Sequence, residues 1–272
     1  MYKLFFTTFL GFLLSAVNVS AQEGIDGVIN AEKNFATYAV QHNTRDAFLY
    51  FLDSANAVVF SNGKIINAFA KWNELKADSD KLLWQPAFAG ISQSGELGFT
   101  TGPWEYKQTL NGNTLAAGTY TTIWHLNNKG DWKFLVDIGT TVSSSANRID
   151  SIKKWIGKTN EITAPEAVDI DKVFIQQYEK LHNDAFKAVI TGDSWFNLPG
   201  QQPAKGVRDI TVALQQIPAG LEFIPMGGGI SSSSDLAYIY GTVRNNDKME
   251  NYLRVWQKTK DGYKLLLQVL KW

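Results

Sequence analysis

The chain of 272 residues contains no cysteine, and its three histidines are scattered. The lack of cysteine excludes disulfide bridges, a thiol nucleophile and a thiolate metal site. The histidines form neither an H-x-H nor an H-E-x-x-H pattern, which argues against a dedicated metal site. Gly227-Gly228-Gly229 is not followed by the Lys-Ser/Thr pair of a phosphate-binding loop, so it indicates a bulge or turn. We therefore expect neither a metal nor a cofactor.

An excess of charge of one sign is also absent. The 26 basic and 26 acidic side chains cancel, so no basic face for nucleic acid is indicated. After residue 21, no apolar stretch approaches the roughly 20 residues of a membrane-spanning helix. Nucleic acid and membrane lipid are therefore not expected as partners of the mature chain.

The N-terminal segment has the pattern of a secretory signal peptide. Lys3 supplies a positive charge, and an apolar run over residues 4–17 follows it. Val19-Ser20-Ala21 then gives the small-x-small pattern that signal peptidase recognises. We expect cleavage after Ala21 and a soluble mature chain that starts near Gln22 and is periplasmic or secreted. An uncleaved anchor is the alternative.

The most informative feature of the chain is an internal repeat. The segment at 82–102, LLWQPAFAGISQSGELGFTTG, recurs 139 residues later at 221–241 as LEFIPMGGGISSSSDLAYIYG, with eight of 21 positions identical. This spacing is too long for a solenoid repeat, so it indicates a duplicated globular domain. We predict a signal peptide at 1–21, a first domain at 22–142, a linker at 143–165 and a second, divergent domain at 166–272.

Each copy begins with helices and continues with long strands. In the first copy, apolar spacing predicts helices over 31–41, 45–52 and 68–75, with Asn43 or Thr44 as a cap for the second. Strands are expected over 57–60, 82–88, 95–101, 104–109, 118–126 and 131–138. In the second copy we expect helices over 173–190 and 206–215, and strands over 238–241, 251–256 and 262–270. The linker, with Ile149, Ile152, Trp155 and Ile156, fits one amphipathic helical turn. This order indicates α+β domains with helices on one face of a bent antiparallel sheet.

A longer signature runs through the strands of the first copy. Its residues are Trp84, Pro86, Ser94, Glu96, Leu97, Gly98, Phe99, Thr100, Thr101, Gly102 and Trp104, then Gly118, Tyr120 and Trp124, then Gly130, Trp132, Lys133, Asp137 and Gly139. It resembles the SnoaL-like proteins of the nuclear-transport-factor-two-like superfamily, and most closely a branch known as a domain of unknown function. The resemblance covers residues 31–140. The second copy follows through its match to the first, but has Arg254 for Thr122 and Gln268 for Asp137.

The resemblance implies two tandem cone-shaped domains, in each of which a strongly bent sheet and N-terminal helices surround a pocket. The superfamily includes isomerases, dehydratases, epoxide hydrolases and non-catalytic domains, and the fold does not choose among them. The resemblance implies that enzymes of this shape use one or two carboxylates, or a His–Asp pair, whose pKa is shifted by an apolar wall.

Asp137 is the candidate general base, with Tyr120 as its partner. The alternative is a strand-end Asp that bonds a nearby turn amide. Because its counterpart Gln268 cannot act as a base, a catalytic Asp137 would leave the second copy inactive or make it a binding copy.

Aromatic residues are the candidate ligand wall in both copies. In the first copy they are Trp84, Trp104, Tyr106, Tyr120 and Trp124, and in the second Phe223, Tyr238, Tyr240, Tyr252 and Trp256. They either line a pocket for an apolar or aromatic ligand or form the core and a dimer interface. Arg254 makes the second copy the better expected site for a polar or anionic ligand.

The sequence leaves two main functional hypotheses, beside a third interpretation as a structural or stress-related envelope protein with no ligand. The first is a binding or interaction protein that takes up a small apolar or aromatic molecule, with its two domains fused as an intrachain pseudo-dimer in a monomeric chain. It rests on the absence of an acid/base pair shared by both copies. The second is an enzyme of the ketosteroid-isomerase, dehydratase or polyketide-cyclase type that uses Asp137 as general base. Whether the chain is an enzyme stays open at this point.

Overall fold

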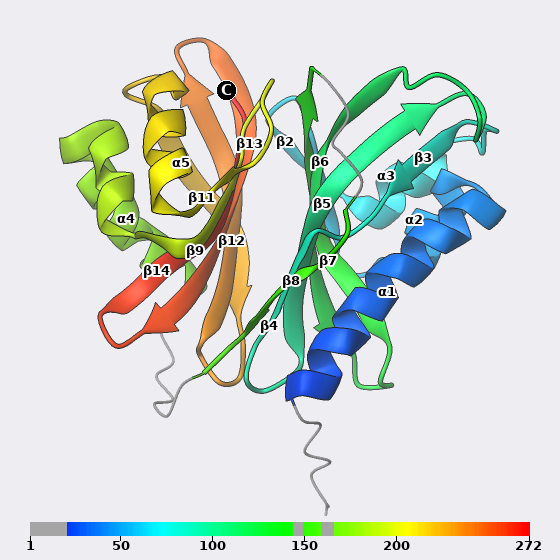
Figure 1. Ribbon diagram of the computed structural model, residues 1–272, viewed down its shortest axis with the longest axis horizontal. Coiled ribbons are helices and arrows are strands. Elements are labelled where there is room, and N and C mark those ends of the chain that lie inside the picture. The colour runs from blue at the N-terminus through cyan, green and yellow to red at the C-terminus, as the bar shows by residue number, and fades with distance from the viewer. Residues whose placement is uncertain (1–20, 144–148, 159–165) are drawn as a thin grey trace, which may run out of the picture.

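The computed structural model describes residues 21–143, 149–158 and 166–272, with side chains from residue 24 onward. The expected signal peptide lies almost wholly outside these residues. Two sheets stand face to face in the middle of the molecule, and helices cover the outer face of each (Figure 1). The protein is thus built from two tandem α+β units, as the repeat indicated. Within the described ranges, no helix is long and apolar enough to cross a membrane.

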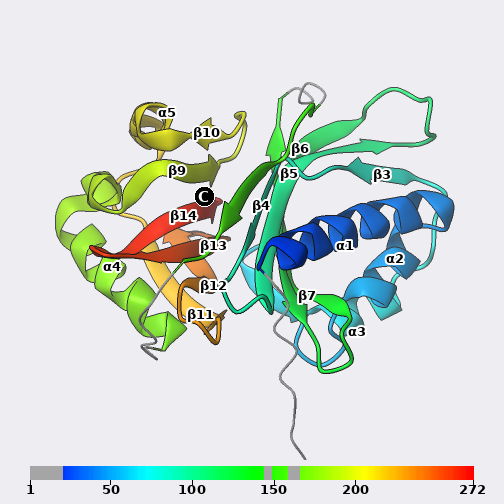
Figure 2. The ribbon, with the colours of Figure 1, turned by 60° about the horizontal axis from the view of Figure 1, so that its bottom comes forward.

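Three helices and an eight-stranded sheet form the first domain. The helices are α1 (Ala21–Gln41), α2 (Thr44–Phe51) and α3 (Ala68–Glu74). The strand order is β2 (Lys64–Asn67), β1 (Val58–Ser61), β7 (Trp132–Val142), β6 (Ala116–Leu126), β5 (Leu97–Lys107), β4 (Phe88–Ile91) and β8 (Lys153–Ile156), with β3 (Lys81–Trp84) paired to the other end of β5. Figure 2 shows α1 lying across this sheet, with α2 and α3 beside it.

The repeated segment bends the sheet. The expected single strand at 82–88 is split into β3 and β4, and both pair with the unbroken β5. Gly102 lies at this bend, where a Cβ atom would come within 2.0 Å of the Gln85 carbonyl oxygen. A Cβ at Gly241 would likewise come within 2.1 Å of the Ile224 carbonyl oxygen. The repeat therefore keeps glycine at this position because the neighbouring backbone leaves no room for a side chain.

The second domain repeats the plan with fewer strands. Its strand order is β10 (Ala204–Lys205), β9 (Ile190–Asn197), β14 (Gly262–Leu270), β13 (Lys248–Thr259), β12 (Leu236–Asn245) and β11 (Glu222–Ile230). Its helical segments are α4 (Ala167–Leu181), η1 (His182–Ala188), α5 (Gly206–Ala213) and η2 (Leu214–Gln216). The expected helix over 173–190 was wrong in its second half, because His182 takes a φ of 50° and the chain continues as a 3-10 helix. Strand β9 was not anticipated.

The helices pack through apolar faces that follow from their periodicity. Ile25, Val28 and Phe35 of α1 are at most 1% exposed and contact a core that includes Trp124 and Phe134. Asn43 caps α2 as expected, since its side chain accepts a hydrogen bond of 2.8 Å from the Asp46 amide. This packing fixes which face of α1 looks into the sheet.

The two sheets meet through one apolar cluster and a polar contact inside it. Phe88, Phe99 and Val136 of the first domain belong to the same cluster as Leu253 and Leu267 of the second. Tyr238, Tyr240 and Trp195 also lie in this interface. The Asn197 side-chain amide donates to the hydroxyls of Thr101 and Thr121, at 2.9 and 3.1 Å. The buried polar groups are thus satisfied across the interface.

The serine-rich turns of the repeat contact each other across the domains. The Ser94 and Ser233 hydroxyls are 2.7 Å apart, and each also accepts a 3.1 Å bond from the other's backbone amide. The Ser232 amide donates to Glu96 at 2.5 Å, and the Gln93 amide donates to Asp235 at 2.9 Å. Each bond has its counterpart in the opposite direction, which is the pattern of a two-fold relation between the copies.

The linker contributes a strand where a helical turn was expected. Residues Lys153–Ile156 form β8, which pairs in parallel with β4. The Trp155 indole donates a 2.9 Å bond to Gln257 of the second domain. The helical interpretation was wrong because β4 offers an edge, and pairing with it satisfies the linker backbone.

Candidate functional site

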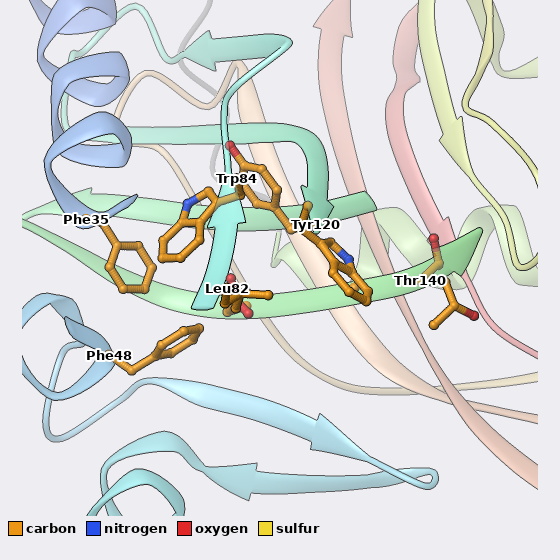
Figure 3. Close-up of a pocket in the computed structure, with 10 residues that line it drawn as sticks. Phe35, Phe48, Leu82, Trp84, Tyr120 and Thr140 are labelled. Atoms are coloured by element: carbon orange, nitrogen blue, oxygen red, sulfur yellow. The ribbon is translucent and has the colours of Figure 1, made fainter. Parts of the chain in front are cut away.

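A cavity of about 240 Å³ lies inside the first domain between its helices and its curved sheet. In Figure 3, Phe35 and Phe48 point into it from the helices, and Trp84, Tyr120 and Thr140 come from the strands. The other lining residues are Leu82, Trp104, Asp137, Gly139 and Thr141. Gly139 and Thr141 are exposed and mark the mouth. The cavity is mostly apolar, with a few polar groups, as small-molecule sites are.

Glycines on two strands make room for the wall of this cavity. A Cβ atom on Gly118 would come within 2.6 Å of the Trp104 ring and 1.8 Å of the Thr140 carbonyl oxygen. A Cβ on Gly139 would lie 3.4 Å from the Trp104 indole nitrogen. The Trp104 ring can therefore pack this close to the two strands because both positions lack side chains.

Glu32 of α1 is a fully buried carboxyl group beside the cavity. It accepts hydrogen bonds from the Trp84 indole at 2.5 Å, from the Trp124 indole at 3.1 Å and from the Thr100 hydroxyl. Burial raises its pKa to about 7, against the lowering effect of these hydrogen bonds, and the nearby Asp137 raises it further. Glu32 does not line the cavity itself, but it bonds to Trp84, which does.

Asp137 of β7 lines the cavity and was identified from the sequence. Burial raises its pKa to about 7, although a 2.9 Å hydrogen bond from the Thr122 hydroxyl opposes the shift. The alternative of an Asp that bonds a turn amide is not what the structure shows, since the partner is the cross-strand neighbour Thr122. Asp137 therefore presents a carboxyl group of near-neutral pKa to the cavity.

Tyr120 of β6 was paired with Asp137 in the sequence interpretation, and both residues line the cavity. Its hydroxyl is buried and has no hydrogen-bond partner of normal geometry. Burial, and then the charges of Glu32 and Asp137, raise the pKa of this hydroxyl well above its usual value, against the lowering effect of the nearby Thr100 hydroxyl. The hydroxyl is therefore protonated and free to bond a ligand.

The corresponding place in the second domain is filled by Arg254 of β13. Its guanidinium Nη1 lies 3.0 Å from both carboxylate oxygens of Asp171, and both residues are fully buried. Its Nε donates a 2.9 Å bond to Gln268. Tyr252 and Trp256 complete the shell of Asp171, with bonds of 2.8 and 3.2 Å. Arg254 is thus held inside the protein.

Three aromatic rings surround the Arg254 guanidinium. Its central carbon lies 4.1 Å from the centroid of Phe223, 4.4 Å from that of Phe174 and 4.5 Å from that of Tyr252. These are cation–π distances. The expectation that Arg254 offers a site for an anionic ligand was wrong, because Asp171 already neutralises the cation and the rings cover it.

The remaining predicted site residues fall outside the cavity. Trp124 is fully buried behind it and bonds Glu32. Tyr106 does not line it, and its hydroxyl bonds Asp80 at the end of the sheet. Tyr238 and Tyr240 face the other domain, where Tyr240 packs on Phe60 at a centroid distance of 5.8 Å. Their assignment to a ligand wall was wrong. Side chains alternate along a strand, and both tyrosines lie on the face of the sheet that meets the other domain, whereas Arg254 lies on the face toward the helices.

Trp256 also borders a separate groove in the second domain, of about 430 Å³, along α4 and η1. Val173 and Leu181, both largely exposed, form part of this groove. No group of three or more His, Cys, Asp or Glu side chains in the described ranges is arranged to hold a metal ion.

Glu32 and Asp171 were missed in the sequence, although a signal for both is present. Glu32-Lys33-Asn34-Phe35 and Asp171-Lys172-Val173-Phe174 share an acid-Lys-x-Phe pattern at the same spacing of 139 residues as the main repeat. Extending the repeat into the helices identifies both acids. The identities between the two copies are denser in the strands, so the strand segments are the more conspicuous part of the repeat.

No family model and no curated protein matches the chain. The solved structures that it resembles include a nuclear-transport-factor-2-like protein of unknown function from Shewanella oneidensis, with 20% identity over 42% of this chain and 96% of that one, at a TM-score of 0.34. Nuclear transport factor 2 from Cryptosporidium parvum has 15% identity over 41% and 98%, at 0.33.

A ketosteroid isomerase-like protein from Erwinia carotovora atroseptica has 14% identity over 39% of this chain and 92% of that one, at a TM-score of 0.31. Each of these matches spans about the length of one domain of the chain. The neighbours are thus nuclear-transport-factor-2-like and ketosteroid-isomerase-like proteins, and the likeness concerns the fold.

Proposed function

We propose that the first domain binds a small molecule in its cavity and that the second domain serves as its structural partner. One observation carries this proposal. The first domain has an accessible cavity with the Asp137 carboxyl and the unpartnered Tyr120 hydroxyl in its wall, whereas Arg254 fills the same place in the second. A buried polar group without a partner is costly unless a ligand or water satisfies it.

A matched pair of variants tests where the ligand binds. Leu82→Trp places a larger side chain in the first-domain cavity, whereas Leu181→Trp makes the same change at the exposed groove of the second domain. Native mass spectrometry of the protein purified from its host should show a retained small molecule in the unmodified chain and in Leu181→Trp. Leu82→Trp should lose it. A ligand retained by Leu82→Trp and lost by Leu181→Trp would overturn the proposal.

A second candidate is acid–base catalysis of the isomerase type. It is favoured by one observation, that Asp137, with a pKa raised by burial to about 7, and the protonated Tyr120 hydroxyl line the same cavity. Asp137 would remove a proton next to a carbonyl group, and Tyr120 would donate a hydrogen bond to the carbonyl oxygen. Hydrogen–deuterium exchange of ketones at the α-carbon tests this. The rate should rise with pH through about 7 and vanish in Asp137→Asn, and equal exchange in that variant would exclude the mechanism.

We also propose that the chain is a divergent SnoaL-like protein that is exported after cleavage behind Ala21. The support is the residue signature of the first domain and the sequence pattern of residues 1–21. N-terminal sequencing of the protein from its host should give Gln22 as the first residue. A chain that begins at Met1 and stays in the cytoplasm would contradict export.

A further inference from the structure

The two domains place Thr122 and Arg254 at the same position of the same hairpin. Thr122 lies opposite Asp137 in the β6–β7 pair, and Arg254 lies opposite Gln268 in the β13–β14 pair. Two residues earlier, Tyr120 lies opposite Gly102 and Tyr252 opposite Gly241, the glycines of the repeat. The register therefore makes Arg254 and Thr122 equivalent positions, and the cross-strand partner of Thr122, Asp137, lines the cavity.

The aromatic rings around this place also correspond. Arg254 is stacked on Phe174, Phe223 and Tyr252, and the repeat relates these rings to Phe35, Trp84 and Tyr120. All three first-domain rings line the cavity. The first domain thus keeps an aromatic box of the kind that holds a cation in the second, but its own chain supplies no cation to it.

The two domains also differ in the balance of acidic and basic groups at this place, and a cationic ligand in the first domain would restore the balance. In the second domain one acid, Asp171, is paired with one cation, and Gln268 is neutral. In the first domain, Glu32 and Asp137 are both acids, and among the described residues their hydrogen-bond partners are hydroxyl and indole groups. Neither carboxyl group is thus paired with a cation of the described chain, and a desolvated carboxylate is costly when it is ionised without one.

We infer that the first-domain cavity takes a small organic cation of the guanidinium type, which occupies the place that Arg254 holds in the second domain. This inference rests on the proposed function and names its ligand class. The cation donates hydrogen bonds to Asp137, where Arg254 bonds Gln268, and to the Tyr120 hydroxyl oxygen. Its flat face packs between Phe35 and Trp84, and Glu32 attracts it from behind Trp84.

Ethylguanidinium is the probe, because it is the fragment of Arg254 that an alanine substitution deletes. Ethylurea has nearly the same shape and no charge, so it is the matched control. Isothermal titration of the unmodified chain should show ethylguanidinium binding at least about tenfold more tightly than ethylurea. The affinity for the cation should increase between about pH 6 and pH 8. Asp137 and Glu32 lose their protons in this range, whereas Tyr120, the other titratable group facing them, stays protonated.

Two exchanges between the domains test the location. Thr122→Arg should supply the missing cation from the chain, and ethylguanidinium binding should fall at least about tenfold, with a raised unfolding temperature. Arg254→Ala should lower the unfolding temperature, and ethylguanidinium, but not ethylurea, should restore part of it. If Arg254→Ala fails to fold, Thr122→Arg still decides the question.

The outcomes separate this inference from the proposed function. Binding of ethylurea or another neutral molecule with no preference for the cation overturns the cationic ligand and leaves the binding function intact. Binding of ethylguanidinium that is unchanged in Thr122→Arg also overturns it, because the cation then sits elsewhere. A cavity that binds neither probe and retains no molecule from the host overturns both proposals.

Discussion

The two domains bury a carboxyl group at the same point of the first helix and satisfy it in different ways. Asp171 receives a cation from its own domain, together with the hydroxyl of Tyr252 and the indole of Trp256. Glu32 receives only neutral donors, and its neighbour Asp137 adds a second acid. The second domain therefore pairs its buried acid with a cation of its own chain, whereas the first holds a cavity and two carboxyl groups of raised pKa.

Removing the cation of the second domain should have the largest effect. Arg254→Met leaves the Asp171 carboxylate buried without its partner, and breaking a buried ion pair costs about 3–5 kcal/mol of unfolding free energy. Urea unfolding measures this. The double variant Asp171→Leu, Arg254→Met removes both charges and should recover most of the loss. A single variant as stable as the unmodified chain would show that the pair does not hold the domain together.

Glu32→Gln should remove a pH dependence that the first domain has. Because the folded-state pKa of Glu32 is raised from 4.5 to about 7, the folded chain binds more protons than the unfolded chain in that window. Its contribution to stability is present below pH 4.5 and is lost as the pH rises through about 7, by at most about 1.4 kcal/mol per pH unit.

Thermal unfolding between about pH 4 and pH 8 checks this sign. The unmodified chain should lose stability relative to Glu32→Gln as the pH rises, so the variant should gain most at the alkaline end. Asp169→Asn, at an exposed helix position of the second domain, is the control and should leave the profile unchanged. Parallel profiles for the unmodified chain and Glu32→Gln would mean that Glu32 does not titrate in this range.

Thr122→Val tests the hydrogen bond to Asp137 at the position where the second domain has Arg254. It keeps the size of the side chain and removes the hydrogen bond that lowers the pKa of Asp137, so this pKa should rise above about 7. The loss of stability should be about 1 kcal/mol above that pKa and smaller below it. A carboxyl-carbon NMR titration of Asp137 reads the pKa directly, and an unchanged midpoint would contradict the role given to Thr122.

The turns that relate the domains should give the smallest effects. Ser94→Ala and Ser233→Ala each remove one side of the reciprocal contact, and each should cost below about 1 kcal/mol because this contact lies at the surface. Guanidinium or urea unfolding should give similar values for both variants, with the double variant less than additive. Clearly unequal costs would contradict the two-fold relation between the turns.

Much of the site follows from local pattern. The repeat located the bend of the sheet, and strand alternation with the residue signature led to Asp137, Tyr120, Trp84 and Trp104, which do line the cavity. Alternation fails for Tyr238 and Tyr240 only because both faces of β12 are buried, one against helices and one against the other sheet. A strand buried on two faces has no polar side to reveal its orientation.

The sequence by itself determined the duplication, the α+β order of each copy and the residues of the bend, because these depend on periodicity and on backbone sterics at Gly102 and Gly241. Only the tertiary structure decided that Glu32 and Asp171 are buried and that Arg254 forms an ion pair with Asp171. The tertiary structure also decided that Asp137 faces a cavity. Burial and charge pairing depend on which helix face meets which strand, and the sequence alone does not give this.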